Sequence, residues 1–162
     1  MNKKVIKVSI LCLGVSMILS SCVSTARISD FSSDSASIDF EKYTTELKTT
    51  STPSWLDKKS NEYYFEINKN ISKDRIDNVI QLSFLHFNYT IKSKNLEQNN
   101  MIGKKGMGFN EWRTVTGIYY KQTDNLLKVY IKSKITQDVT GGSRENRALK
   151  IGEYLEAQLK AN

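Results

Sequence analysis

The pattern of apolar and polar positions predicts a strand followed by a helix in the middle of the chain. Residues 62–68 alternate Tyr63, Phe65 and Ile67 with more polar neighbours, which is typical of a strand with one apolar face. After Ser72, a suitable N-cap residue, apolar positions recur at helical spacing. They are Ile76, Val79, Ile80, Ser83, Phe84 and Phe87, and we expect Leu82 and Leu85 to widen the buried stripe.

The second half of the chain predicts further strands and a final helix. Residues 89–93, 112–121 and 126–135 are rich in β-branched and aromatic side chains, and residues 122–125 supply a turn between the last two strands. The polar, glycine-containing stretch 94–110 predicts a long loop or a loosely paired hairpin. The last strand places Leu127, Val129 and Ile131 on one face. A final helix carries an apolar stripe of Ala148, Ile151, Gly152, Leu155 and Leu159.

This order of elements predicts an α+β fold within a single domain of residues 58–162. We expect a small antiparallel sheet of about four strands with two helices packed on one face, in the order β-α-β-β-β-α. Strands linked mostly by hairpins, with two helices available to cover one face, are typical of this class.

The stretch before this domain is polar and predicts a flexible tether. Residues 23–37 are rich in serine and offer few apolar groups to offset the entropy of ordering. Phe40, Tyr43 and Leu47 indicate a short helix within residues 22–57, and Pro53 ends it. We therefore expect residues 58–162 alone to unfold with nearly the stability of the longer chain.

The first residues have the layout of a secretory signal. Lys3, Lys4 and Lys7 precede an uncharged, mostly apolar run from residue 8 to residue 19. The sequence Leu19-Ser20-Ser21-Cys22 that follows resembles the lipobox of bacterial lipoproteins. The resemblance implies that residues 1–21 are a signal peptide removed by signal peptidase II, and that the Cys22 sulfur carries a lipid. An uncleaved transmembrane helix needs about 20 apolar residues, more than this stretch offers. An ordinary secretory signal fits residues 19–22 less well.

The same resemblance predicts where the protein resides. Bacterial lipoproteins with Asp after the lipidated cysteine stay in the inner membrane, and here Val23 stands at that position. We therefore expect an anchor in the outer membrane with the domain facing the periplasm. In a Gram-positive host the same anchor would hold the protein on the cell membrane.

Composition excludes several kinds of chemistry. The net charge of +7 falls to +4 when the three signal lysines leave, and Cys12 leaves with them, so the mature chain keeps only Cys22. A lipidated Cys22 leaves no thiol for a disulfide or a cysteine-ligated metal. His86, the one histidine, lies in the most apolar helix and is expected to be structural or on the helix surface. The acid pairs Glu62/Glu66 and Glu153/Glu156 are expected to be solvated. We expect no enzyme, no cofactor and no metal site.

The remaining candidate site is a basic face of the predicted sheet. Lys128, Tyr130, Lys132 and Lys134 alternate onto the side opposite Leu127, and Lys121 is placed beside them on the neighbouring strand. Such a face could meet lipid headgroups, lipopolysaccharide, glycans or an acidic protein, and export makes nucleic acid an unsuitable partner. The alternative is a solvated outer face whose lysines discourage aggregation.

These observations predict a non-enzymatic role. The first hypothesis is an interaction or assembly accessory of an envelope or secretion complex, held to the membrane by its lipid and contacting other envelope proteins. The alternative is an envelope lipoprotein that binds a lipid, a glycan or another anionic molecule, on the side of Tyr63, Phe65 and Phe84. A third hypothesis is a hydrolase whose site is assembled from scattered residues.

Overall fold

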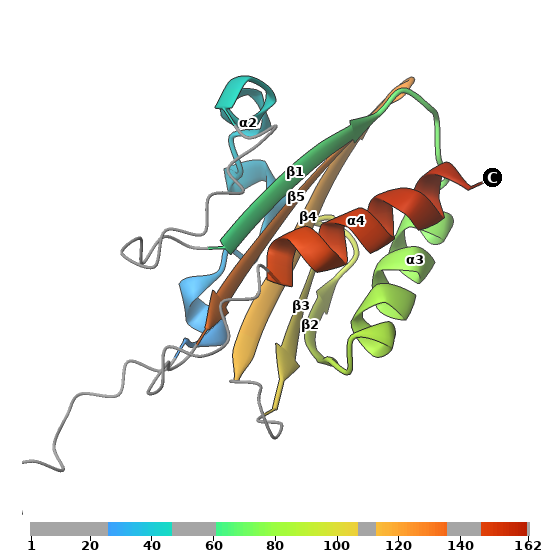
Figure 1. Cartoon of the computed structure of the whole chain (residues 1–162). Helices are drawn as coiled ribbons and strands as arrows, with labels where there is room; N and C mark the ends of the chain where they lie inside the picture. The colour runs from blue at the N-terminus through green and yellow to red at the C-terminus, as the bar shows by residue number, and fades with distance from the viewer. Residues whose placement is uncertain (1–25, 47–60, 107–112, 136–146, 162) are drawn as a thin grey trace, which may run out of the picture.

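A computed structural model describes residues 26–46, 61–106, 113–135 and 147–161. Their central feature is one antiparallel sheet of five strands in the order β1-β5-β4-β3-β2, with two long helices on one face and residues 26–46 on the other (Figure 1). The predicted α+β class with an antiparallel sheet is confirmed, and the expected strand number is one too low. The elements are β1 (Asn61–Ile67), α3 (Lys73–His86), β2 (Thr90–Asn95), β3 (Asn100–Lys105), β4 (Thr114–Thr123), β5 (Leu126–Ile135) and α4 (Arg147–Lys160).

Strand β3 lies where we predicted a loop or loose hairpin, and it pairs with β4 along its length and with β2 through a register with one irregularity between Ile91 and Ser93. Met101 is buried against the helices and Ile102 is buried on the opposite face. Because both faces of β3 are covered, the strand lacks the apolar–polar alternation that marks a half-exposed strand. Asn99, at φ 53°, makes the left-handed turn that enters it.

Helices α3 and α4 cover one face of the sheet and form the main core with it. Ile80 and Phe84 of α3, Leu155 of α4, and Val129 and Ile131 of β5 belong to one buried cluster, and the alternation of β5 predicted this face for Val129 and Ile131. The expected widening of the α3 stripe is wrong, because Leu82 and Leu85 are 50% and 63% exposed. They lie on the flank of α3 that neither the sheet nor α4 covers. Ser72 occupies the N-cap position, but its side chain makes no capping hydrogen bond.

Residues 26–46, which we call the strap, cover the opposite face of the sheet (Figure 1). The strap contains η1 (Ile28–Asp30), η2 (Ser35–Ser37) and α2 (Phe40–Glu46). Phe31 packs on Ile102 and Val115, and Phe40 packs among three tyrosines of the sheet. A Cβ on Gly117 would lie 2.9 Å from the Phe31 ring, so the bare backbone of β4 makes room for that ring. The expectation of a free tether is therefore wrong for these residues.

The polar residues of the strap form turns. This explains why the serine-rich composition led to the wrong prediction of a flexible tether. Asp34 Oδ1 accepts a hydrogen bond from the Ala36 amide at 2.8 Å, and the Ser32 hydroxyl donates to the Asp34 carbonyl at 2.8 Å. Such local bonds satisfy the backbone without a regular helix or strand. Tyr119 OH donates to the Ser32 carbonyl at 3.0 Å and the Ser35 amide to Gln98 O at 3.2 Å, which ties the strap to the sheet.

The short helix predicted around Phe40 and Tyr43 is present as α2. Leu47, Pro53, Cys22 and the signal peptide lie outside the described residues. In the described part of the chain, no helix has both the length and the apolar character needed to cross a bilayer.

Candidate functional site

The structure places the predicted basic face beneath the strap. Lys128, Tyr130, Lys132 and Lys134 share the face of β5 opposite the main core, as alternation predicted. Lys121 lies on β4 directly opposite Lys128 in the strand register. Cys22 and residues 19–21 lie outside the described part of the chain, so the lipid site stays a prediction.

Each lysine of the β5 row faces a carboxylate. Lys134 Nζ lies 2.7 Å from Asp30 Oδ2 and Lys128 Nζ lies 2.7 Å from Glu41 Oε1, both on the strap. Lys132 Nζ lies 4.0 Å from Glu62 Oε1 on β1. The hydrogen bond from Lys134 is the main reason why the pKa of Asp30 is lowered. Carboxylates therefore pair with the lysines of this row, although the Lys134 side chain remains 43% exposed.

Tyr130 is buried within a cluster of tyrosines between the strap and the sheet. The Tyr43 ring of α2 stacks on Tyr130 with centroids 4.4 Å apart and planes 17° apart. Tyr64 OH donates to Glu66 on the same strand, and Tyr119 lies at the other side of the cluster. Burial raises the pKa of Tyr119 to about 12 and raises the pKa values of Tyr64 and Tyr130 still further from their ordinary value.

Alkaline titration should therefore unfold the domain. A tyrosine with a raised folded pKa contributes stability that is complete below its unfolded pKa of about 10 and is lost as pH rises through the folded value. Absorbance at 295 nm should show five of the eight tyrosines ionising only as far-UV circular dichroism is lost. They are Tyr63, Tyr64, Tyr119, Tyr120 and Tyr130. Ionisation of all eight near pH 10 in a domain that stays folded would contradict this burial.

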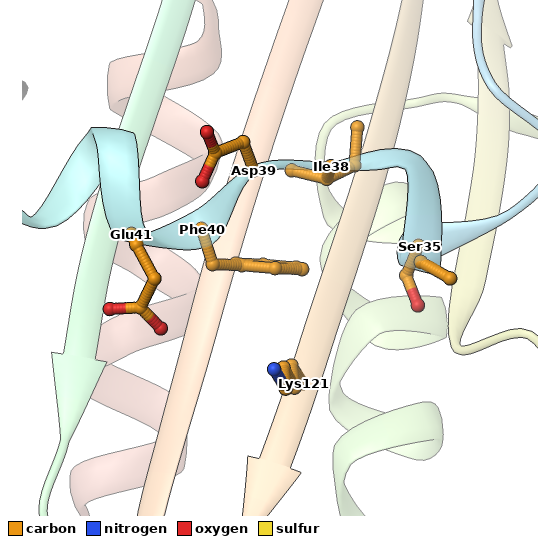
Figure 2. Close-up of a pocket in the computed structure, with 7 residues that line it drawn as sticks. Ser35, Ile38, Asp39, Phe40, Glu41 and Lys121 are labelled. Atoms are coloured by element: carbon orange, nitrogen blue, oxygen red, sulfur yellow. The ribbon is translucent and has the colours of Figure 1, made fainter.

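A shallow groove of about 370 Å³ lies where the strap turns from η2 into α2. It is lined by Ser35, Ala36, Ile38, Asp39, Phe40, Glu41 and Lys121. Figure 2 shows the Phe40 ring lying across the strands, with Asp39 just before α2, Glu41 on α2 and Lys121 on β4. Two acids face one lysine here, so the groove suits a small, partly apolar or cationic group better than an anion.

Sequence reasoning missed a polar cluster on the helix face. Asp77 of α3 is 5% exposed, accepts a hydrogen bond from Tyr120 OH at 2.8 Å and lies 3.5 Å from Lys73 Nζ. Burial, then the bond to Asp77, raises the pKa of Tyr120. The sequence signal for this cluster is Asp77, an aspartate within the apolar stripe of the helix and four residues after Lys73. The cluster joins α3 to β4 and has the character of a structural tie.

Two further side chains carry groups that can bind ligands or transfer protons, Arg147 and His86. Arg147 at the start of α4 is 5% exposed, and its guanidinium nitrogens have no hydrogen-bond partner among the described residues. His86 ends α3 on the surface, where its ring stacks on Tyr154 with centroids 4.3 Å apart. Within the described ranges, no three side chains of His, Cys, Asp or Glu come together as a metal site requires.

The described residues therefore present three features: a row of lysines paired with carboxylates, a shallow groove, and a buried hydrogen bond between Tyr120 and Asp77. No protein-family model matches this chain, and no curated protein matches it at a significant level.

Proposed function

We propose that this chain is a lipid-anchored protein of the bacterial cell envelope that acts as a non-enzymatic interaction or assembly accessory of an envelope or secretion complex. Its anchor would lie in the outer membrane, with the domain on the periplasmic side. In a Gram-positive host the anchor would lie in the cell membrane.

The observation that carries this proposal is the position of the lipobox relative to the fold. Leu19-Ser20-Ser21-Cys22 ends four residues before Ala26, which is buried on the sheet. Cleavage before Cys22 would remove none of the described elements and would leave the lipid site directly beside them. This arrangement supports a mature protein that is the complete strap-and-sheet unit attached to lipid.

Exposed apolar residues on α3 support a role in protein contacts. Leu82 and Leu85 lie three residues apart on the helix and are the most exposed large apolar side chains in the described part of the chain. Contiguous exposed apolar patches mark surfaces that bind other proteins, and Leu82 and Leu85 would supply the apolar contacts of such a surface. Their side of α3 faces away from the sheet, so a partner could reach it while the strap remains in place.

The groove favours one alternative, an envelope lipoprotein that binds a small ligand. Phe40 and Ile38 offer apolar contact there, with Asp39, Glu41 and Lys121 around them. The location that the sequence suggested for a ligand is wrong, because Phe65 and Phe84 belong to the packed core between the sheet and the helices α3 and α4.

Replacing Cys22 with serine should abolish incorporation of labelled palmitate and leave an uncleaved precursor or a soluble form. The reason is that the Cys22 sulfur is the proposed acyl acceptor. Cys12→Ser is the matched control, since Cys12 lies in the signal peptide and should leave labelling unchanged. Palmitate labelling that persists in Cys22→Ser would overturn the proposed anchoring.

Recovery of the protein from crosslinked envelopes separates the two candidate roles. A stoichiometric protein complex, lost in Leu82→Gln/Leu85→Gln, supports the assembly role. Recovery of the lipoprotein alone with a bound small molecule, lost in Phe40→Ala, supports the ligand-binding alternative. Both variants should be compared with the wild type for thermal unfolding, because Phe40 also holds the strap.

A further inference from the structure

Helix α4 begins with an arginine whose charge is buried. Arg147 is 5% exposed, and its Nε, Nη1 and Nη2 atoms have no hydrogen-bond acceptor among the described residues. The ion pairs resolved in the same part of the chain do not include it. A guanidinium stays protonated in proteins, so burial cannot neutralise it. Because a buried charge without a counter-charge is strongly destabilising, this guanidinium requires an anion.

The flank of α4 that carries Arg147 faces α3. Tyr154 and Gln158, seven and eleven positions later, share this flank at helical spacing. Gln158 O accepts a hydrogen bond from Arg75 Nη2 near the start of α3 at 3.3 Å, and the Tyr154 ring stacks on His86 at the end of α3. The two helices therefore run in opposite directions along this flank. Arg147, two turns closer to the start of α4, lies beyond the end of α3.

The sheet beneath the start of α4 is polar. Figure 1 shows α4 beginning in front of β5 and β4, near the last residues of β5 and the first residues of β4, and α4 contacts β5. Thr114, Thr116 and Ser133 lie there on the helix side of the sheet and are at most 1% exposed. The Thr116 hydroxyl donates to Tyr89 OH at 3.2 Å and lies 2.7 Å from Ser133 Oγ. These residues supply buried hydroxyls, but no charge, beneath Arg147.

We propose that Arg147 and the hydroxyls of Thr114, Thr116 and Ser133 form a binding site for a small oxyanion, a carboxylate or a phosphate group. We call this the Arg147 site. The planar guanidinium donates two parallel hydrogen bonds to two oxygens of such a group. Hydroxyl groups rotate to suit their neighbours, so they can donate to the remaining oxygens. The low exposure of Arg147 limits the occupant to a small group.

The Arg147 site is distinct from the groove beside α2. That groove lies on the strap face of the sheet and is lined by Asp39, Glu41 and Lys121, whereas the Arg147 site lies on the helix face. An oxyanion bound there would connect α4 to β4 and β5 and so stabilise the folded domain. This binding goes beyond the proposed assembly role and does not depend on lipidation of Cys22.

Thermal unfolding of the mature chain carrying Cys22→Ser tests the site. The protein is refolded from guanidinium chloride into chloride buffer, which removes any anion carried over from the cell. It is then titrated with sodium phosphate or with sodium acetate at constant ionic strength. The melting temperature should rise saturably with at least one of these salts, because a ligand that binds only the folded state stabilises it. The salt that produces the rise identifies the oxyanion as phosphate or carboxylate.

Substitutions of two arginines separate the site from general salt effects. Arg147→Gln should abolish the rise, and Arg147→Lys should weaken the apparent affinity about tenfold, since lysine keeps the charge but lacks the planar fork. Arg75→Gln is the matched control, because it removes the same group from α3 and should leave the rise unchanged. A rise that persists in Arg147→Gln, or no rise of the wild type with either salt, would overturn the proposal.

Arg147→Met in chloride buffer gives a readout that needs no ligand. Its melting temperature should equal or exceed that of the wild type, because an apolar side chain of similar length replaces an unpaired buried charge. A large fall would show that the guanidinium is already paired within the chain and would overturn the site. By sequence, Asp138 and Glu145 precede Arg147, and double-mutant cycles with Asp138→Asn and Glu145→Gln would then identify the partner.

Amide chemical shifts locate the bound oxyanion. Saturation with the stabilising salt should shift the signals of Arg147, Thr116 and Ser133 and leave those of Phe31 and Phe40 in the strap unchanged. Shifts confined to exposed lysines would show general salt binding and contradict the proposed site.

Discussion

Removing residues 22–46 should lower the melting temperature of the mature chain by at least roughly 15 °C, or abolish cooperative unfolding. The deletion strips Phe31 and Phe40 from the sheet and exposes Tyr119 and Tyr130, which are 1% and 2% exposed in the folded domain. Loss of one buried phenylalanine costs about 3–5 kcal/mol. The whole stability of a domain is about 5–15 kcal/mol, so losing two is severe.

Two shorter changes serve as controls for this deletion. A mature chain that begins at Ala26 should keep its melting temperature, since every described contact of the strap remains. Phe40→Ala should cost about 3 kcal/mol and leave a folded domain. If residues 47–162 unfolded at the temperature of the longer chain, the strap would be a tether after all, as its composition first suggested.

Valine in place of Gly152 should destabilise the domain by about 2 kcal/mol or more. A Cβ at this position of α4 would lie 2.0 Å from Tyr63 Cδ1 on β1, far inside van der Waals contact. The Tyr63 ring is held by a hydrogen bond from its OH to Glu156 Oε2 at 3.0 Å, so its displacement also breaks a tie between β1 and α4. Chemical denaturation gives the loss as a shift of the midpoint.

A double-mutant cycle identifies the cause of that loss. Gly152→Val should cost much less in a Tyr63→Ala background, because the added side chain then fills the space that the ring vacated. Gly106→Ala is the matched control, since a Cβ there meets nothing within 4 Å. Additive losses from Gly152→Val and Tyr63→Ala would show that helix–strand packing at this point is not the reason.

The elements that the sequence predicted well are those with one covered and one exposed face. Helix α4 buries the stripe of Ile151, Leu155 and Leu159, and β5 sorts Val129 from Lys128 by simple alternation. The sequence did not predict strand β3 because both of its faces are buried, and a strand buried on both faces lacks the alternation of apolar and polar residues. The predicted burial of Leu82 and Leu85 is wrong because residue type alone does not show which flank of a helix lacks a packing neighbour.

The basic face of the sheet shows most clearly what a local sequence pattern cannot predict. Alternation correctly placed Lys128 and Lys134 on one side of the sheet, but their carboxylate partners on the strap are 87 and 104 positions away in sequence. No local pattern could have revealed that the strap returns to neutralise them. The serine-rich composition suggested a flexible tether, whereas Phe31 and Phe40, nine residues apart, indicate two points at which the strap attaches to the sheet.

The most direct test of the packed strap is a nuclear Overhauser spectrum of the mature chain from residue 22 with Cys22→Ser. The structure predicts cross-peaks between the ring protons of Tyr43 and Tyr130, whose centroids are 4.4 Å apart, and between Phe31 and the methyl groups of Val115. Absence of these cross-peaks, with random-coil chemical shifts through residues 26–46, would contradict the packing of the strap on the sheet.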